Sequence, residues 1–369
     1  MCTTTRRLPI LSSEALHRVS SLDGLRGILA TAVAVHHFIV VYYWHTTGMW
    51  QTTDSRLINN MGAVAVTLFF MITGYLFTRK VQNGAMDWAQ VLVSRLLRIW
   101  PMYLFSVGVI VAISFYQTAG TLAPVADTLR GIGHWLLFVG KPVNGFEDTA
   151  RINASVQWTL LYETVFYLCL PLLYCVLKRK VPIKALLVGL ILLACLWPVF
   201  KDHVSSRFMR IFLAGITVAL LEDWFKSKSF NYKNLRWTAL AAGLLIISLF
   251  VKSYTKVQLF LLMVPFGLLV LGNNLHGLLE HRGLKVLGEV SFSIYLLHGI
   301  VIYIMFSVFS LYDFSHADLT VYAIYLIPVI IVTASISVLT YWFIERPAIL
   351  MTKKFSYQRK NNKVKEVIV

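Results

Sequence analysis

Long apolar runs recur along the whole chain, and they restrict its fold more than any other feature of the sequence. A helix that crosses a bilayer needs about 20 consecutive, mostly apolar residues, and ten runs approach that length. Their expected limits are 27–44, 62–78, 99–116, 158–177, 183–200, 208–221, 237–251, 257–272, 286–308 and 320–344. The sequence therefore predicts an all-α fold, a polytopic transmembrane helical bundle with about ten spanning helices.

The composition agrees with a membrane protein and argues against a nucleic-acid partner. Hydrophobic residues make up 57% of the 369 residues and charged residues 14%, whereas soluble domains are about half apolar and a quarter charged. The net charge of +17 is spread over short segments between apolar runs, so the expected partner is the lipid bilayer. The Cys, His, Asp and Glu residues show no metal-ligand spacing, and no metal is expected.

Lysine and arginine predict how the spans are oriented. With the N-terminus inside, 25 of the 34 Lys and Arg residues fall in inside segments and nine outside, as the positive-inside rule requires. Ten spans then place both termini in the cytoplasm. We expect a cytoplasmic N-terminal segment over 1–25, a membrane domain over 26–346 and a basic cytoplasmic tail over 347–369. The short apolar piece 135–140 is predicted to be re-entrant or interfacial within a 117–157 loop.

An arginine and a histidine occupy the first apolar run. Arg26 and His37 are eleven residues apart, so they share a helix face and are separated by about 16 Å along the axis. Arg26 is expected at the membrane surface, where Asp23 can pair with it, and Asp23 is also a pocket candidate. His37 is expected deep in the bilayer, where ionisable residues are functional candidates. The alternatives are a topological anchor for Arg26 and a core role for His37. The neighbouring His36 points about 100° away and is not expected to face the same pocket.

Two arginines precede the third apolar run. Arg95 and Arg98 are one turn apart on one helix face, and guanidinium groups bind phosphate bidentately. Together they are candidates to hold a phosphate-bearing ligand, although arginines before a span also serve topology. In the second run, Thr73 and Gly74 are expected to let helices pack closely.

The fourth run carries a carboxylate. Glu163 follows Trp158 and Tyr162 and is predicted to enter the membrane from the outer side. A carboxylate at that depth needs a partner such as a histidine, an arginine or a substrate hydroxyl. We interpret Glu163 as a catalytic candidate and the two aromatic residues as pocket candidates.

The last two runs add a polar face and a terminal acidic residue. Ser291, Tyr295 and His298 follow an i, i+4, i+7 pattern, which places them on one helix face as pocket candidates. Glu345 precedes Pro347 at the end of the tenth run, where such a residue more often anchors a helix than reacts.

Taken together and in this order, these motifs resemble the acyltransferase-3 family of integral-membrane acyltransferases, from Leu22 to Pro347. The resemblance implies ten core helices, an acyl-CoA donor, usually acetyl-CoA, and a carbohydrate hydroxyl as acceptor. His37 matches the catalytic histidine of the family and Arg26 its partner, and Arg95 and Arg98 match a pair associated with donor binding. Thr73 departs from the family pattern, where serine is common. An SGNH esterase-like domain after the last span is not expected.

These observations predict a membrane O-acyltransferase in a bacterial cytoplasmic (inner) membrane. His37 is the expected general base, since a desolvated imidazole stays neutral and can accept a proton. The CoA head would stay cytosolic on Arg26, Arg95 and Arg98. The acceptor, an O-antigen, an exopolysaccharide or a lipid-linked precursor, would enter from the outer side past Glu163 and the 117–157 loop.

Two other functions are compatible with the same residues. Intramembrane ionisable residues also suit a multi-pass transporter or flippase, although no repeat between the halves of the chain is visible. An acyltransferase acting on a small lipid or an antibiotic is the second alternative. The sequence leaves open whether His37 acts as a base in one step or carries the acyl group transiently.

Overall fold

The computed structural model describes residues 20–50, 53–84, 86–228 and 230–352, and within these ranges the chain is helical without a β-strand. The expected N-terminal segment up to residue 19 and the tail from residue 353 lie outside the described residues. The α-helices are α1 (Ser20–Thr47), α2 (Arg56–Gln82), α3 (Trp88–Gln117), α4 (Val125–Leu136), α5 (Thr149–Ile152), α6 (Trp158–Lys178), α7 (Ile183–Phe200), α8 (Ser206–Lys226), α9 (Leu235–Ser248), α10 (Lys256–Val270), α11 (Arg282–Glu289), α12 (Ser291–Tyr303), α13 (Leu319–Ala323) and α14 (Leu326–Thr340).

Each of the ten apolar runs folds as helix. Seven helical segments in the described residues are long and apolar enough to cross a membrane. These are α1, α2, α3, α6 and α7, together with the continuous segments Ser291–Val308 and Leu319–Thr352. The other three runs fold as α8, α9 and α10. The all-α prediction is confirmed, and the number of helices that cross the bilayer remains a prediction.

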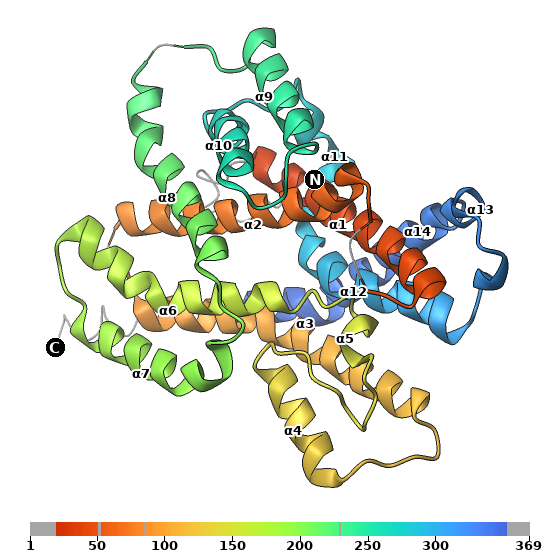
Figure 1. Cartoon of the computed structure of the whole chain (residues 1–369). Coiled ribbons are helices and arrows are strands. Elements are labelled where there is room, and N and C mark those ends of the chain that lie inside the picture. Colours follow the sequence, from red (N-terminus) through yellow and green to blue (C-terminus); the bar gives the residue numbers. More distant parts are fainter. Residues whose placement is uncertain (1–19, 51–52, 85, 229, 353–369) are drawn as a thin grey trace, which may run out of the picture.

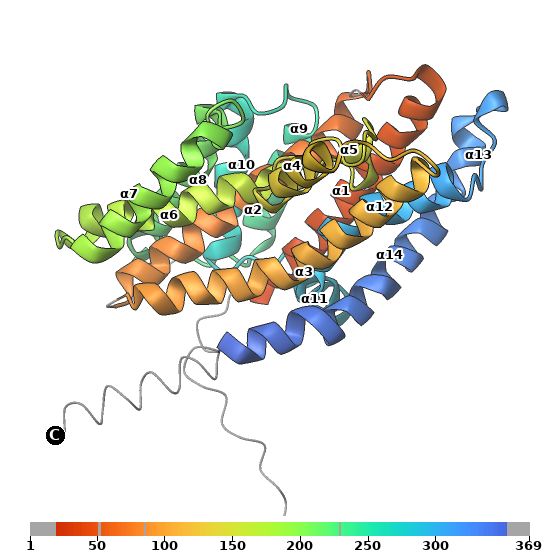
Figure 2. The same cartoon turned by 90° about the horizontal axis from the view of Figure 1, so that it is seen from below.

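The bundle is built around α1, α2 and α12. Figure 1 shows these three in the middle of the molecule, with α4, α7, α9 and α13 toward its rim. Helix α2 packs against α1, α6 and α8, and α1 packs against α11 and α12. Seen at right angles, the long helices α3, α6 and α14 slant in the same direction (Figure 2). The side chains that fill the space between α1, α2 and α12 therefore come from helices far apart in the sequence.

Close helix contacts are made through glycine. A Cβ atom at Gly74 of α2 would collide with the carbonyl oxygen of Phe212, and one at Gly215 of α8 would collide with that of Met71. Helices α2 and α8 therefore touch through their backbones, which confirms the packing role expected for Gly74. At the start of α1, Gly24 and Gly27 make similar approaches to the segment around α11.

Two expected segments differ from the structure. The ninth run, 286–308, is divided because α11 ends at Glu289 and α12 begins at Ser291. At this break the backbone of Gly288 lies against that of Asp23, and the Ser291 hydroxyl donates a hydrogen bond to the Gly288 carbonyl oxygen (2.8 Å). The 117–157 loop contains the helices α4 and α5, which pack on α3. Residues 135–140 begin at the end of α4.

Candidate active site

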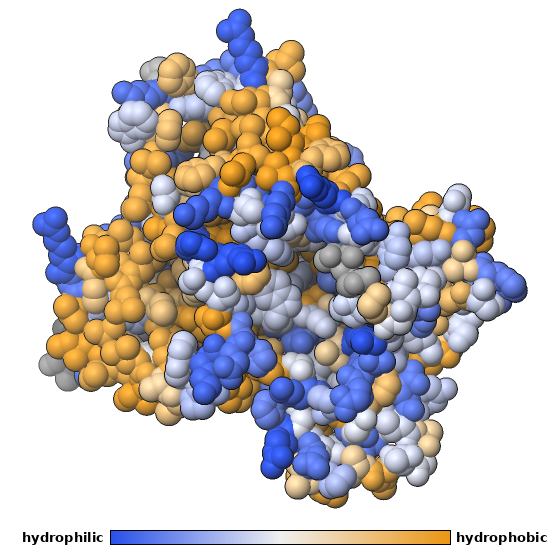
Figure 3. Space-filling view, in the orientation of Figure 1, coloured by the Kyte–Doolittle hydropathy of each residue, from blue (hydrophilic) through white to orange (hydrophobic). Residues whose placement is uncertain are grey.

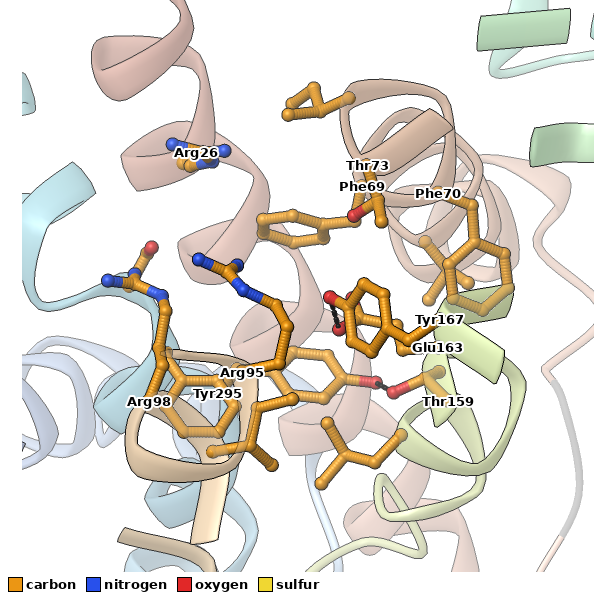
Figure 4. Close-up of a pocket in the computed structure, with 16 residues that line it drawn as sticks. Arg26, Phe69, Phe70, Thr73, Arg95, Arg98, Thr159, Glu163, Tyr167 and Tyr295 are labelled. Carbon is orange, nitrogen blue, oxygen red and sulfur yellow. Dashed lines mark hydrogen bonds between the residues drawn. The ribbon is translucent and has the colours of Figure 1, made fainter. Parts of the chain in front are cut away.

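The three predicted arginines meet in one cavity of about 120 Å³, which we call the arginine cavity. Arg26 comes from α1, and Arg95 and Arg98 come from α3. Figure 4 shows the three guanidinium groups on one side of the cavity, with Glu163 and Tyr167 facing them from α6. Ser291 also lines this cavity. The sequence correctly placed the arginines together, since α1 and α3 deliver them from the same end of the bundle.

Carboxylates orient two of the arginines. The Arg26 guanidinium lies 3.2 Å from the Asp23 carboxylate, as the sequence predicted. Arg98 lies 3.7 Å from the Glu345 carboxylate, which also accepts a hydrogen bond from Ser293 (3.0 Å). Asp23 and Glu345 are themselves buried. They are positioning residues, and Asp23 does not line the cavity as a substrate contact. Arg26 lies in the second turn of α1, and Glu345 lies in the helical segment that continues from α14 to Thr352, so both described ends of the chain lie near this cavity.

Arg95 has an unfilled hydrogen-bonding position. Its Nε atom is buried and has no hydrogen-bond partner, and its guanidinium carbon lies 5.2 Å from the centroid of the Phe77 ring. A buried donor without a partner is costly. A phosphate oxygen entering the arginine cavity would supply that partner, so the residues present fit an anionic ligand.

Glu163 lies in the arginine cavity, where its carboxylate accepts a hydrogen bond from the Tyr167 hydroxyl (2.8 Å). The sequence had placed Glu163 beside the entrance of the acceptor. Trp158, five residues earlier on α6, lines a different cavity that contains His37. Five residues turn a helix by about 140° from its starting direction, so the two side chains open to different spaces.

A thin wall separates the arginine cavity from the cavity that contains His37. Tyr295 and Val66 line both cavities. The Tyr295 hydroxyl lies 2.9 Å from the Thr159 hydroxyl and donates to the Val156 carbonyl oxygen (3.2 Å). Figure 4 shows the contact between Tyr295 and Thr159 at the edge of the arginine cavity. Tyr295 and Val66 therefore border both spaces, and Tyr295 is the polar one of the two.

The second cavity has a volume of about 440 Å³, and we call it the histidine cavity. It is lined by His36 and His37 of α1, Trp158 of α6 and two cations, Arg207 and Lys252. His37 is half-buried in its wall. This cavity is several times larger than the arginine cavity and is able to admit a bulky substrate.

His37 is held by a second histidine. Its Nδ1 lies 2.9 Å from Nε2 of His298, and Nδ1 of His298 lies 3.0 Å from the Ile294 carbonyl oxygen. A carbonyl only accepts, so Nδ1 of His298 carries the hydrogen and its Nε2 is the acceptor. His37 then donates from Nδ1 and keeps a lone pair on Nε2. The hydrogen-bond pattern therefore assigns the tautomer of His37 that can accept a proton.

His36 also lines the histidine cavity, so the expectation that it would not share a pocket with His37 is wrong. The two rings lie 4.9 Å apart between centroids, and the cavity is wide enough to reach both. Their partners differ, however. His36 Nδ1 lies 2.9 Å from the Ile58 carbonyl oxygen, and the ring edge packs where a side chain at Gly62 would be. This environment binds His36 to α2 and gives it a packing role.

Two further pocket candidates, Tyr162 and His298, line neither cavity. The Tyr162 hydroxyl donates to the His203 carbonyl oxygen (2.8 Å) and accepts from the Ser205 backbone N–H (2.7 Å), so it fixes the connection between α7 and α8. His298 is fully buried behind His37.

Four site residues were not predicted from the sequence. Thr159 and Tyr167 are partners of Tyr295 and Glu163, and the i, i+4 spacing of Glu163 and Tyr167 was a usable signal. Arg207 and Lys252 had entered only the count of outside charges. Within the described residues, no three His, Cys, Asp or Glu side chains group in a way that could hold a metal ion.

Comparisons with known proteins bear on the same segment. A family described as "Acyltransferase domain" (Acyl_transf_3) matches residues 19–342. "Putative O-acetyltransferase SACOL0978" of Staphylococcus aureus (strain COL) is 24% identical over 245 residues, which cover 58% of this chain and 37% of that protein. "Acyltransferase MdmB" of Streptomyces mycarofaciens is 28% identical over 174 residues, which cover 46% of this chain and 42% of that protein.

A fungal protein gives a shorter match. "O-acetyltransferase PaAT-1" of Phomopsis amygdali is 40% identical over 75 residues, which cover 18% of this chain and 15% of that protein. The matched part of the chain spans about two fifths of the length of the Staphylococcus and Streptomyces proteins. No solved structure matches the chain.

Proposed function

Because the chain belongs to the acyltransferase-3 family, we propose that it is a membrane O-acyltransferase. It transfers an acetyl group from acetyl-CoA in the cytosol to a hydroxyl group of a bacterial surface carbohydrate or its lipid-linked precursor. The observation that carries the proposal is the pairing of His37 with His298. That pair holds a proton-accepting imidazole next to Tyr295, which also borders the arginine cavity.

His37 is the general base of the proposed reaction. Nε2 of His37 accepts the proton of the acceptor hydroxyl while the hydroxyl oxygen attacks the thioester carbonyl carbon. The carbon–sulfur bond then breaks, the CoA thiolate leaves, and the proton held by His37 returns to that thiolate. His298 orients His37 and also stabilises its protonated state, because the hydrogen bond that its Nε2 accepts from Nδ1 of His37 is stronger when His37 is charged. A direct transfer needs no acyl-histidine.

The arginine cavity is the proposed donor side. Arg26, Arg95 and Arg98 supply planar donors for the phosphates of CoA, and the buried Nε of Arg95 has room for an anionic partner. The cavity is too small for the whole CoA head. The head therefore stays at its mouth, and only the pantetheine arm passes toward Tyr295. Glu163 lies on this donor side with Tyr167.

An open cavity beyond the outer end of α1 supports a carbohydrate acceptor. Its volume is about 630 Å³, and we call it the aromatic cavity. Trp44 and Phe314 line it with aromatic rings, and Asp148 and Asp313 line it with carboxylates. The Arg151 guanidinium lies over the Trp44 ring (4.9 Å) and pairs with Asp148 (2.7 Å). Hydrogen bonds from the side chain and backbone of Ser315 hold the pKa of the Asp313 carboxyl below its usual range. Flat faces beside ionised acceptors suit a sugar ring and its hydroxyls.

The proposed orientation places the arginine cavity in the cytoplasm and the histidine and aromatic cavities outside. Reporter fusions in the connection between α1 and α2 and at the C-terminus test it, because ten spans put these sites on opposite sides. Both reporters on one side would overturn the orientation and the inner-membrane topology proposed here.

The function itself is tested in two steps. Purified protein incubated with radiolabelled acetyl-CoA should release CoA in the presence of cell-surface glycan. Mass spectrometry of surface glycans from cells with and without the gene should then show an acetyl group that only the wild-type gene restores. Glycan that keeps the acetyl group without the gene, together with no CoA release, would contradict the proposal. Movement of a solute without CoA release would favour a transporter.

A further inference from the structure

Four cations converge where α8 and α10 begin. Arg207, Arg210 and Lys256 line a small cavity of about 60 Å³, and Arg207 and Lys252 line the histidine cavity. We call these four residues the cation cluster. Arg207 belongs to both spaces, so the cluster is continuous with the cavity that holds His37.

The cluster occupies positions that disfavour positive charge. Ser205 caps α8 and Thr255 caps α10, and neither helix has an acidic residue in its first turn. The N-terminus of a helix carries a partial positive charge, so acidic side chains are favourable there and cations are not. Arg207 and Lys256 stand within the first two residues of these helices. Two helix N-termini and four cations together make a site that an anion would stabilise.

No carboxylate of the described residues forms an ion pair with the cluster. None of its four side chains has an ion pair or a side-chain hydrogen bond there, and all four are exposed. Hydrophilic residues gather over this part of the face, near the start of α8 and the connection between α9 and α10 (Figures 1 and 3). The same four residues belong to the nine Lys and Arg that the positive-inside pattern places outside, against the trend of the chain.

The connection that carries Lys252 is held in place by buried amides. Asn60 of α2 donates to the carbonyl oxygens of Leu249 (2.8 Å) and Val251 (2.7 Å). The Asn60 amide oxygen in turn accepts a hydrogen bond from Gln258 (2.7 Å). Asn60 and Gln258 are both 1% exposed. Buried amides with satisfied hydrogen bonds fix a loop rigidly.

Tyr162 fixes the connection that leads into α8, and so to Arg207, in a similar way. It bridges the His203 carbonyl oxygen and the Ser205 N–H, directly before α8 begins. The core helices α2 and α6 therefore hold in place the connection between α9 and α10 and the connection that leads into α8. A surface whose only role was solubility would not need its loops anchored to the centre of the bundle, whereas a binding site does.

We propose that the cation cluster binds a phosphate group of the acceptor. Arginine forks and helix N-termini recognise phosphate oxygens, and a phosphate bound at Arg207 and Lys252 brings the attached sugar into the histidine cavity. The acceptor is then a sugar phosphate ester, such as a lipid-linked saccharide. This inference rests on the proposed function for its place in catalysis. The phosphate could also come from a membrane lipid headgroup, which the experiment separates.

Direct binding tests the cluster without relying on acyl transfer. The probes are farnesyl phosphate and farnesol, titrated into purified protein in detergent and followed by isothermal titration calorimetry. Wild-type protein should bind farnesyl phosphate at least about tenfold more tightly than farnesol, since hydrogen bonds to charged groups are among the strongest in proteins. The Arg207→Gln/Lys252→Gln variant should lose that preference. Equal affinity of the wild-type protein for both probes would overturn the inference.

The control is Lys201→Gln. Lys201 is an exposed cation in the same connection as His203, but it does not line the histidine cavity or the small cavity beside it. This variant should keep the wild-type preference for farnesyl phosphate. Loss of the preference in Lys201→Gln as well would mean that general surface charge attracts the probe, which contradicts a defined site. Thermal unfolding of each variant shows whether it is folded.

Kinetics then separates the possible sources of the phosphate. With acetyl-CoA as donor, Arg207→Gln/Lys252→Gln should raise the KM for a phosphate-bearing acceptor at least about tenfold and leave the KM for acetyl-CoA near the wild-type value. A rise in the donor KM alone would assign the cluster to CoA and overturn the inference.

Nanodiscs test whether the cluster binds lipid headgroups instead. If farnesyl phosphate binding is lost in phosphatidylglycerol nanodiscs but not in phosphatidylcholine nanodiscs, the cluster binds lipid headgroups. If no transfer is detected but the phosphate preference is, the anion site stands and the proposed function fails.

Discussion

The arginine cavity and the cation cluster are both rich in positive charge, but carboxylates pair with cations only in the arginine cavity. In the arginine cavity, Asp23 lies against Arg26 and Glu345 lies near Arg98. The cations of the cluster have no such carboxylates among the described residues and are exposed to solvent. A carboxylate orients a guanidinium before any ligand arrives, at the cost of neutralising part of its charge. An uncompensated cluster keeps its full charge and its attraction for an anion.

The difference indicates two kinds of recognition. The arginine cavity is small, and carboxylates orient two of its arginines, which suits the proposed phosphate-bearing donor because that donor must be placed accurately. The cation cluster borders a cavity of about 440 Å³, so it can hold a phosphate while leaving room for different sugars. Variants on the two sides should therefore change different kinetic constants, and a variant in the wall or at His37 should change the rate of transfer itself.

The largest effect is expected for His37→Ala. Removal of a general base typically slows a reaction by about 10²–10⁴-fold. His36→Ala, one residue away, should keep most of the activity, because His36 is bonded to the Ile58 carbonyl and packs on Gly62. Acyl transfer measured for both variants at matched amounts of membrane-inserted protein checks this. An active His37→Ala protein would refute the mechanism.

Variants of the paired arginines should affect the donor side. We expect Arg95→Ala/Arg98→Ala to weaken acyl-CoA binding by at least about 100-fold, since each lost charge-assisted hydrogen bond costs about 1.5–3 kcal/mol. The lysine variants should be milder because they keep the charge and lose only the planar fork. The affinity for acyl-CoA and the KM for the acceptor are the measurements. Unchanged donor affinity in the double alanine variant would count against this role.

Of the two arginines, Arg95 is the one whose substitution should disturb folding less. Its Nε has no partner to lose, whereas Arg98→Ala leaves the buried Glu345 carboxylate without its counter-charge. Removing one member of a buried ion pair is destabilising. The single variant Arg95→Lys therefore reports donor binding with the least disturbance of folding.

A smaller effect is expected for His298, which acts through His37. His298→Leu removes the acceptor for Nδ1 of His37 and should lower kcat by about 10–100-fold, the range seen for outer partners that orient metal-bound histidines. His298→Gln keeps an oxygen that can accept this hydrogen bond and should restore part of the rate. The pH dependence of kcat should differ between the leucine variant and the wild type. Equal loss in both variants with an unchanged pH profile would indicate a structural role only.

The smallest effect is expected for Tyr162→Phe. This variant tests whether the arginine cavity and the histidine cavity bind different substrates. The variant leaves the His203 carbonyl and the Ser205 N–H without their partner, which loosens the segment before Arg207. Each of these two neutral hydrogen bonds contributes about 0.5–1.5 kcal/mol, and they act on acceptor binding only through the loop, so the acceptor KM should rise about threefold to tenfold. The control is Tyr167→Phe, on the same helix, whose hydroxyl serves Glu163 in the arginine cavity. If both variants change the same substrate's KM, the two cavities do not serve separate substrates.

The helices could be predicted more fully than their interruptions. Apolar runs of bilayer length specify helices by hydropathy alone, and all ten runs fold as helix. The break at Val290 depends on contact between the backbones of Gly288 and Asp23, which are far apart in sequence. The helix α4 lies in a polar segment where no long apolar run reveals it.

The site was predictable where its residues lie on one helix. The i, i+3 spacing identified Asp23 with Arg26 and paired Arg95 with Arg98. His37 and His298 are 261 positions apart in the sequence, and no local pattern specifies their contact. Arg207 belongs to the first turn of α8 and Lys252 to the connection between α9 and α10, and they line the cavity of His37 only through the packing of α8 and α10 on α2.

The wall formed by Tyr295 and Val66 has a bioenergetic consequence. In a living membrane the voltage drops mostly across the part of the protein where water is excluded, and each elementary charge there is worth about 2.3 kcal/mol per 100 mV. A neutral acyl group feels no such force, but a proton or a sodium ion does. The polar side-chain atoms at this partition are the uncharged hydroxyls of Tyr295 and Thr159. The proposed transfer to an outside acceptor would therefore place no fixed charge of these two residues between the two cavities.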